Sequence, residues 1–118
     1  MNNPLADLGK VIDLRSLQDH QLLRQCVLVD SGKAQVTHFI IPKGEEIPTH
    51  EAHGEIVIHC LTGQVLVTAL KQSKILFSDH ILCLAADEPF SIRATQDAAL
   101  LATIILPKDG KSVELIGN

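Results

Sequence analysis

At 118 residues, with 46% hydrophobic residues, the chain is long enough to form one folded domain with its own core. Its net charge of −4 argues against the concentrated basic surface that nucleic-acid binding requires. It has no Trp or Tyr and only three Phe, so it also lacks the aromatic platforms on which bases and sugars stack. We therefore expect a single domain over 1–118 that does not bind nucleic acid.

The cysteines and the apolar runs indicate in which cellular compartment the protein is expected. Cys26, Cys60 and Cys83 are widely spaced, and each lies within an apolar run. An odd number at this spacing favours reduced core cysteines over a disulfide framework. The N-terminal ten residues lack the basic start and apolar centre of a signal peptide, and the longest apolar run, 98–106, is too short to span a bilayer. These features predict a cytoplasmic protein with no membrane partner.

Taken in order, the chain alternates short β-prone runs with turn signals. Residues 1–10 are expected to form a loose leader, 11–14 a short edge strand and 15–21 a turn or one helical turn. Polar segments at 30–33 and 70–74 predict turns, and a polar, histidine-bearing corner precedes residue 56. Further strands are expected at 22–29, 34–41, 56–61, 64–68, 75–77, 81–85, 90–94, 98–106 and 112–116. Short strands with almost no helical periodicity predict an all-β, antiparallel barrel or sandwich at about 22–107.

Some of these strands also indicate which side chains share a face. In 34–41, one face carries Val36, His38 and Ile40, and the other carries Thr37, Phe39 and Ile41. The runs 56–61 and 98–106 are apolar on both faces, whereas a strand with one face in water should alternate. We expect one face to line the barrel interior and the other to be covered by a second sheet layer or another subunit. A homodimer is the expected assembly.

The stretch from Pro42 to Val65 resembles the first motif of the cupin superfamily. Gly44, His50 and Gly63 stand at the spacing of that motif's first glycine, first histidine and last glycine. Residues 78–90 are similar to a diverged second motif, and the order of elements from 11 to 106 is similar to that of small single-domain bacterial cupins. The resemblance implies a double-stranded β-helix barrel, here with a short N-terminal extension.

The metal positions of the motif are where this sequence departs from it. A metal-binding cupin holds its ion with two His and one Glu from the first motif and a third His from the second. Here only His50 is a ligand-type residue, because the other three positions are Ala52, Ile56 and Phe90. One imidazole does not hold a divalent ion tightly. The resemblance therefore implies a degenerate metal site, no metal cofactor and no identified catalytic residue.

If Ile56 points inward as the motif's Glu does, strand parity turns Ile58 and Cys60 inward as well. With His50 and Phe90 they would line an apolar pocket, which Ile92 would join. The candidate ligand-binding residues are therefore His50, Ile56, Ile58, Cys60 and Phe90. The leading hypothesis is a non-catalytic or weakly catalytic cupin that binds a small, largely apolar ligand in this pocket, gated by His50.

Two other functions remain open. His50, His53 and Glu55 could form a rearranged 2-His-1-carboxylate site for a divalent transition metal, giving a metal-dependent oxygenase or isomerase. Strand parity, however, turns Glu55 away from His50. A structural or regulatory homodimer with a filled core would need no ligand. We expect His38 to be a satisfied wall residue, His59 to be partly buried, and the glutamates at 45, 46, 51 and 55 to form a solvated rim.

Overall fold

The computed structural model of the protein describes residues 4, 6–19, 24–50 and 53–106. Within these residues no helix is long and apolar enough to cross a membrane. Every paired strand is antiparallel to its neighbours. The elements in chain order are the 3-10 helix η1 (Leu14–Asp19) and the strands β1 (Gln25–Asp30), β2 (Ala34–Ile41), β3 (Glu46–His50), β4 (Ile56–Thr62), β5 (Gln64–Ala69), β6 (Gln72–Phe77), β7 (His80–Leu84), β8 (Phe90–Ala94) and β9 (Ala98–Ile105).

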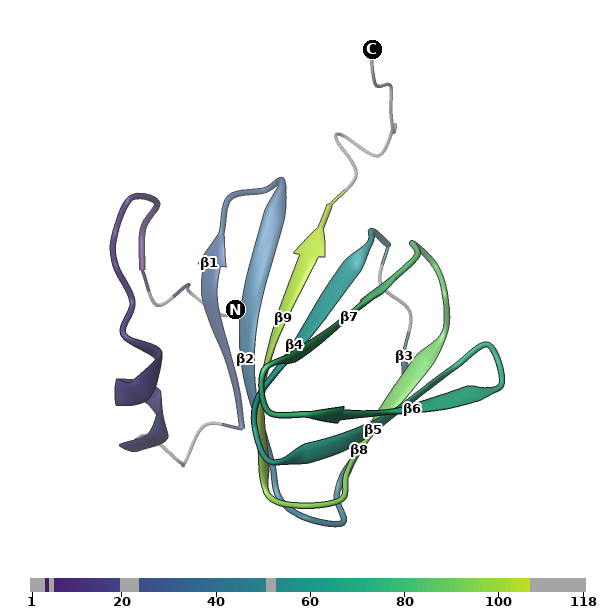
Figure 1. The fold of residues 1–118 in the computed structure, drawn as a ribbon. Coiled ribbons are helices and arrows are strands. Elements are labelled where there is room, and N and C mark those ends of the chain that lie inside the picture. The colour runs from purple at the N-terminus through teal and green to yellow at the C-terminus, as the bar shows by residue number, and fades with distance from the viewer. Residues whose placement is uncertain (1–3, 5, 20–23, 51–52, 107–118) are drawn as a thin grey trace.

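The strands form two sheets, and the chain passes repeatedly from one to the other. One sheet has the order β1-β2-β9-β4-β7, and the other has the order β3-β8-β5-β6. In Figure 1 the five-stranded sheet stands upright, and the four-stranded sheet crosses it at the lower right, so that the two curl around a common interior. The predicted all-β, antiparallel architecture is confirmed.

The interior is filled from the inward faces of both sheets. Along β4, burial alternates with the pleat, and Ile56, Ile58 and Cys60 are 4%, 0% and 0% exposed. Val65 and Val67 of β5 meet them from the other sheet as members of the same apolar cluster. The predicted inward parity of β4 is therefore confirmed.

The prediction of an edge strand at 11–14 was wrong, because a helical turn occupies the end of this segment. The Asp13 carboxylate accepts a hydrogen bond from the backbone N–H of Arg15 at 3.0 Å. The Asp13 carbonyl accepts one from the backbone N–H of Ser16 at 3.1 Å. Side-chain capping of this kind starts a helix rather than a strand. In the expected leader, the N–H of Ala6 donates to the carbonyl of Leu28 at 3.1 Å, which ties this segment to β1.

At the edges of the four-stranded sheet, β3 was missed and β6 was predicted only in part, at 75–77, because the sequence there is polar. The expected polar corner contains β3, which pairs only with β8 and accommodates Pro48 where its register shifts. The expected turn at 70–74 is only two residues long, because Ala69 pairs with Gln72. β6 therefore begins before Ile75, and Leu76 is its only buried residue. The strand expected at 112–116 lies outside the described residues.

Candidate ligand-binding site

A cavity of about 240 Å³ lies between the two sheets. Its wall is mainly apolar and draws on both sheets: Phe39, Ile47, Ile56, Phe90 and Ile92 are among the lining residues. Ile56, Phe90 and Ile92 are each 4% exposed. All five residues lie on paired strands, so the wall is part of the folded core rather than of a loop.

One side of the cavity is polar. Gln25 of β1 and Gln35 and Thr37 of β2 also line it. Thr37 is buried, and the amide nitrogen of Gln35 donates to a carboxylate oxygen of Asp30 at 3.3 Å, which orients the Gln35 side chain. Sequence reasoning did not name these residues as part of the site. The alternation along β2 could have found Gln35 and Thr37, since it placed Thr37 on the face opposite His38.

Of the five predicted ligand-binding residues, Ile56 and Phe90 line the cavity. Ile58 and Cys60 point into the same interior, but they are fully buried and do not line it. The Cys60 Sγ lies 3.5 Å from the carbonyl oxygen of Thr62. Burial, and secondarily the negative charge of Asp79, raises the pKa of the Cys60 thiol. The thiol is therefore protonated at neutral pH and poorly suited to act as a nucleophile.

The two histidines of the alternative metal site are not brought together by any described contact. His50 ends β3, and its backbone pairs with Phe90 of β8; its side chain lies outside the described part of the structure. His53 is exposed, with its Nδ1 3.5 Å from Oδ1 of Asp87. Glu55 is exposed at the start of β4.

The described residues at the metal positions of the cupin motif do not fit a metal ion. Ile56 and Phe90 stand at two of these positions, and both present apolar side chains to the cavity. Ala52 lies outside the described residues. Among the residues that are described, no group of three or more His, Cys, Asp or Glu side chains could hold an ion.

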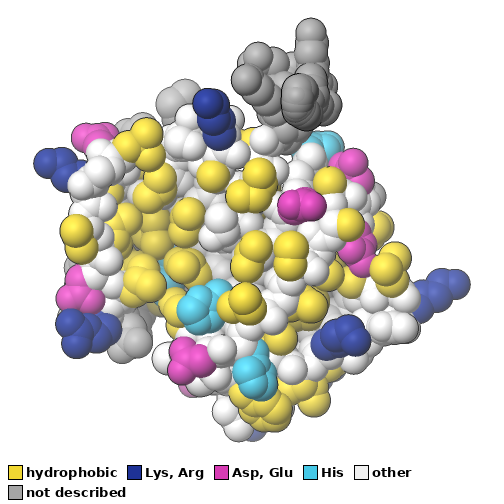
Figure 2. Space-filling view, turned by 45° about the horizontal axis from the view of Figure 1, so that its top comes forward, with side chains coloured by type: hydrophobic (Ala, Val, Ile, Leu, Met, Phe, Trp, Pro, Cys, Tyr) yellow, Lys and Arg dark blue, Asp and Glu magenta, His cyan; other side chains and the backbone are white. Residues whose placement is uncertain are grey.

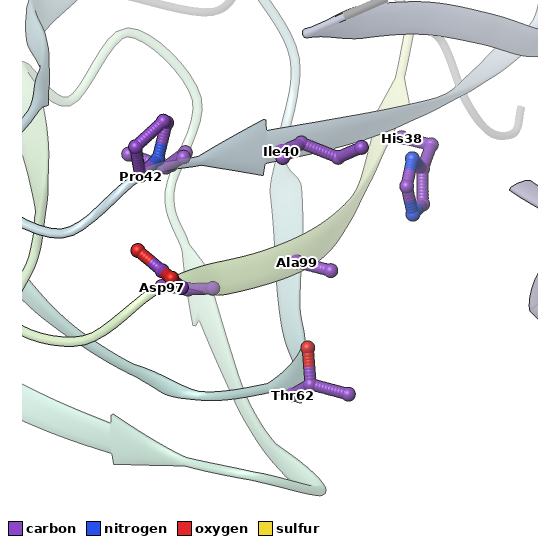
Figure 3. A pocket seen from close by; sticks show the side chains of 8 residues that line it. His38, Ile40, Pro42, Thr62, Asp97 and Ala99 are labelled. Atoms are coloured by element: carbon purple, nitrogen blue, oxygen red, sulfur yellow. The ribbon is translucent and has the colours of Figure 1, made fainter. Parts of the chain in front are cut away.

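A second hollow, of about 480 Å³, lies on the outer face of the five-stranded sheet. It is bordered by His38 and Ile40 of β2, Ala99 of β9, Thr62 at the end of β4, and Asp97 in the turn before β9 (Figure 3). His38 is only 3% exposed, and its burial lowers the pKa of the imidazole, which is neutral at pH 7. Among the described residues no buried side-chain nitrogen or oxygen lacks a hydrogen-bond partner, so the imidazole is not an unsatisfied buried group.

Glu45, His59 and His80 lie at or near the surface, and Glu51 of the predicted rim lies outside the described residues. Glu45 is exposed and forms an ion pair with Arg24. The His59 side chain is 36% exposed, and its Nε2 lies 3.9 Å from a carboxylate oxygen of Asp79. His80 is exposed, and its Nδ1 accepts the backbone N–H of Phe77 at 3.0 Å. None of these contacts faces the interior cavity.

Comparison with known proteins identifies the fold. No protein-family model and no curated protein matches the chain. Among solved structures, a conserved protein of unknown function from Streptococcus pyogenes is similar over 92% of this chain and 96% of its own, with a TM-score of 0.75 and 21% identity. A cupin superfamily protein from Desulfitobacterium hafniense is similar over 70% of this chain and 75% of its own, with a TM-score of 0.67 and 21% identity. An RmlC-like cupin with a double-stranded β-helix fold, from Methanocaldococcus jannaschii, is similar over 70% of this chain and 80% of its own, with a TM-score of 0.64 and 17% identity. The resemblance to small cupins is thus confirmed in three dimensions, and the chain has the cupin double-stranded β-helix fold.

Proposed function

We propose that this protein binds a small, largely apolar ligand in the cavity between its two sheets. The observation that carries the proposal is that Ile56 and Phe90, at positions where the cupin motif has metal ligands, line an internal cavity with other apolar side chains. Apolar walls with a few placed polar groups are typical of small-molecule sites.

The dimensions and lining of the cavity narrow the class of ligand. At about 240 Å³ it is smaller than the roughly 300–1,000 Å³ of drug-sized sites, which favours a compact molecule such as a monocyclic compound. Gln35 and Thr37 offer an amide and a hydroxyl at one side, so a single hydroxyl or carbonyl on the ligand would find a partner there. The ligand is uncharged, because the described lining residues include no ionic partner and burial of an unpaired charge is costly.

Titration with a defined probe tests this proposal. 4-Methylphenol, an uncharged ring with one hydroxyl, is added to labelled protein and followed by NMR. Ala102 of β9 lines the cavity, and Ala102→Leu extends a side chain into it. Ala86→Leu adds the same side chain at an exposed position. We expect saturable binding that weakens at least tenfold in Ala102→Leu and is unchanged in Ala86→Leu. No saturable binding, or equal binding by both variants, would contradict the proposal.

We further propose that the barrel holds no resident metal and that the protein is not a metal-dependent oxygenase or isomerase. Elemental analysis of untagged protein after metal-supplemented expression tests this directly. A near-stoichiometric ion that is lost in both His50→Ala and His53→Ala would reverse the proposal and make the rearranged metal site the one to assay.

The protein is also proposed to be a cytoplasmic homodimer. Cys26, Cys60 and Cys83 are all free, which suits a reducing compartment. Strands β4 and β9 are apolar on both faces, and no second sheet covers their outer faces within the described residues. A partner subunit would remove these faces from water.

A further inference from the structure

Ten residues stand in two rows across the outer face of the five-stranded sheet, and none carries a formal charge when histidine is neutral. Each row takes one residue from each strand, in the order β1-β2-β9-β4-β7. The first row is Cys26, His38, Leu101, His59 and Ile81. The second is Val29, Val36, Thr103, Val57 and Cys83. We name these two rows the outer apolar face.

The outer apolar face leaves large hydrophobic side chains in water. Ile81 is 65% exposed, and Ile105, which continues the same face of β9, is 47% exposed. Leu101 and Val57 are half-buried. In the space-filling view, hydrophobic side chains gather over much of one side of the molecule, with most charged side chains toward its margin (Figure 2). Exposed patches of this kind mark interaction sites in soluble proteins.

The outer surface of the other sheet is different. A corresponding row across β3, β8, β5 and β6 consists of Glu46, Arg93, Leu66 and Ile75, and so includes an acidic and a basic residue. Ile75 is 49% exposed there. The absence of charge is therefore particular to the five-stranded sheet, and it does not follow from composition alone.

We propose that the outer apolar face is where a second copy of this chain docks, related by a twofold axis. The assignment rests on the proposed homodimer and names its surface. A twofold contact places the same patch on both partners, and an uncharged patch avoids the like-charge repulsion that a chain of net charge −4 would otherwise meet.

The outer apolar face is large enough to form the centre of a contact. Its two rows span five strands at a spacing of about 4.8 Å with two outward residues per strand, a flat footprint of roughly 24 by 14 Å, or about 340 Å². A standard interface buries about 800 Å² per partner, so the residues around the two rows would supply the rest of the contact. The hollow beside His38 makes the face concave there, and a partner group entering it could hydrogen-bond to the imidazole.

Sedimentation equilibrium on the full chain tests the assignment with matched lysine variants. Ile81→Lys and Leu101→Lys each place two charges, one from each copy, in the proposed interface. Ile75→Lys introduces the same charge at a similarly exposed strand position of the other sheet. We expect a wild-type dimer with a Kd in the micromolar range or below. Its Kd should rise roughly 100-fold in the first two variants and stay unchanged in the third, because unpaired charges are costly to desolvate.

The outcomes separate the two proposals. A wild-type protein that is monomeric up to 100 μM would overturn both the homodimer and its surface, and would leave the ligand-binding proposal standing. A dimer that persists in both interface variants, or that dissociates equally in Ile75→Lys, would overturn the surface alone. Circular dichroism checks that each variant is folded; should Leu101→Lys not fold, Ile81→Lys decides, because this side chain is mostly exposed in the monomer.

Discussion

Gly54 stands where the chain enters β4, directly against the end of β9. A Cβ atom at this position would lie 1.6 Å from the carbonyl oxygen of Ile105 and 2.7 Å from its carbonyl carbon. Both are backbone atoms, so they cannot rotate away as a flexible side chain can. Gly54→Ala is therefore expected to force β9 away from β4.

The expected loss in free energy of unfolding follows from the displacement that the new Cβ atom requires. Ordinary contact begins at 3.4 Å, so the two atoms must separate by 1.8 Å, the difference between 3.4 and 1.6 Å. A shift of that size breaks the 2.9 Å hydrogen bond from the N–H of Ile105 to the carbonyl of Glu55. It also disturbs the adjacent pairing of Ile56 with Ile104. Losing two or three sheet hydrogen bonds in this way should cost about 3–5 kcal/mol.

Gly44→Ala is the matched control. Gly44 has φ +87°, but a Cβ there meets nothing within 4 Å. Its cost is therefore only the conformational strain of a non-glycine residue, about 1 kcal/mol. Urea unfolding followed by circular dichroism measures both variants against wild type. The reasoning is refuted if Gly54→Ala lies within 1 kcal/mol of wild type, or if Gly44→Ala is the more destabilised of the two.

Three other predictions concern single features. The free energy of unfolding of the wild type should fall more steeply below pH 6.5 than that of His38→Gln. Burial lowers the pKa of His38 from 6.5, so on acidification the unfolded chain takes up a proton more readily than the folded chain does. Urea titrations at pH 7.5 and 5.5 measure the difference. The double variant Leu70→Asn, Lys71→Gly should raise the free energy of unfolding by about 1–2 kcal/mol, and with it the melting temperature, because both residues of this two-residue turn have positive φ (52° and 64°). Equal or lower stability would argue against the turn geometry. Ile58→Ala should cost about 2–5 kcal/mol in urea unfolding, because the side chain is fully buried; a loss under 1 kcal/mol would mean that the site collapses or is not packed.

The fold could be predicted because its central strands follow simple rules. The run at 56–61 was placed on β4 with the correct inward parity, since apolar, β-branched residues between turn signals leave few alternatives. The glycines of the motif also have physical reasons in the structure. Gly63 has φ +81°, and a Cβ there would lie 2.0 Å from the carbonyl oxygen of Asp97, so the turn after β4 and the turn before β9 can approach this closely only with glycine.

β3 and the first half of β6, at the edges of the four-stranded sheet, could not be predicted because their side chains show no hydrophobic pattern. β6 pairs with β5 alone and buries one side chain, so its exposed residues Gln72, Ser73 and Lys74 can all be polar. Its turn uses Leu70 and Lys71 in left-handed conformations, where Asn and Gly would have marked a hairpin. The strand is held by backbone hydrogen bonds and register, which a hydrophobic pattern does not record.

The sequence predicted which side chains of β4 face the interior, but not which of them line the cavity. Parity correctly turned Ile56, Ile58 and Cys60 inward, but it could not say which of them would meet open space. That depends on how the other sheet fills the interior. Ile58 and Cys60 are enclosed completely, whereas Ile56 borders the cavity together with Ile92 of β8. Volumes between sheets are set by packing across them, and a single strand's sequence does not contain them.

The two apolar residues at the motif's metal positions are physically consistent only as a pair. Ile56 and Phe90 border one cavity, and each is 4% exposed. A carboxylate at position 56 would need a cation beside it, because an unpaired buried charge is strongly unfavourable. An imidazole at position 90 would be one ligand short of an ion without that carboxylate. If only one of these two positions carried its polar residue, that residue would be a buried polar group without a partner. Apolar residues at both positions instead give a wall suited to an uncharged, largely apolar molecule.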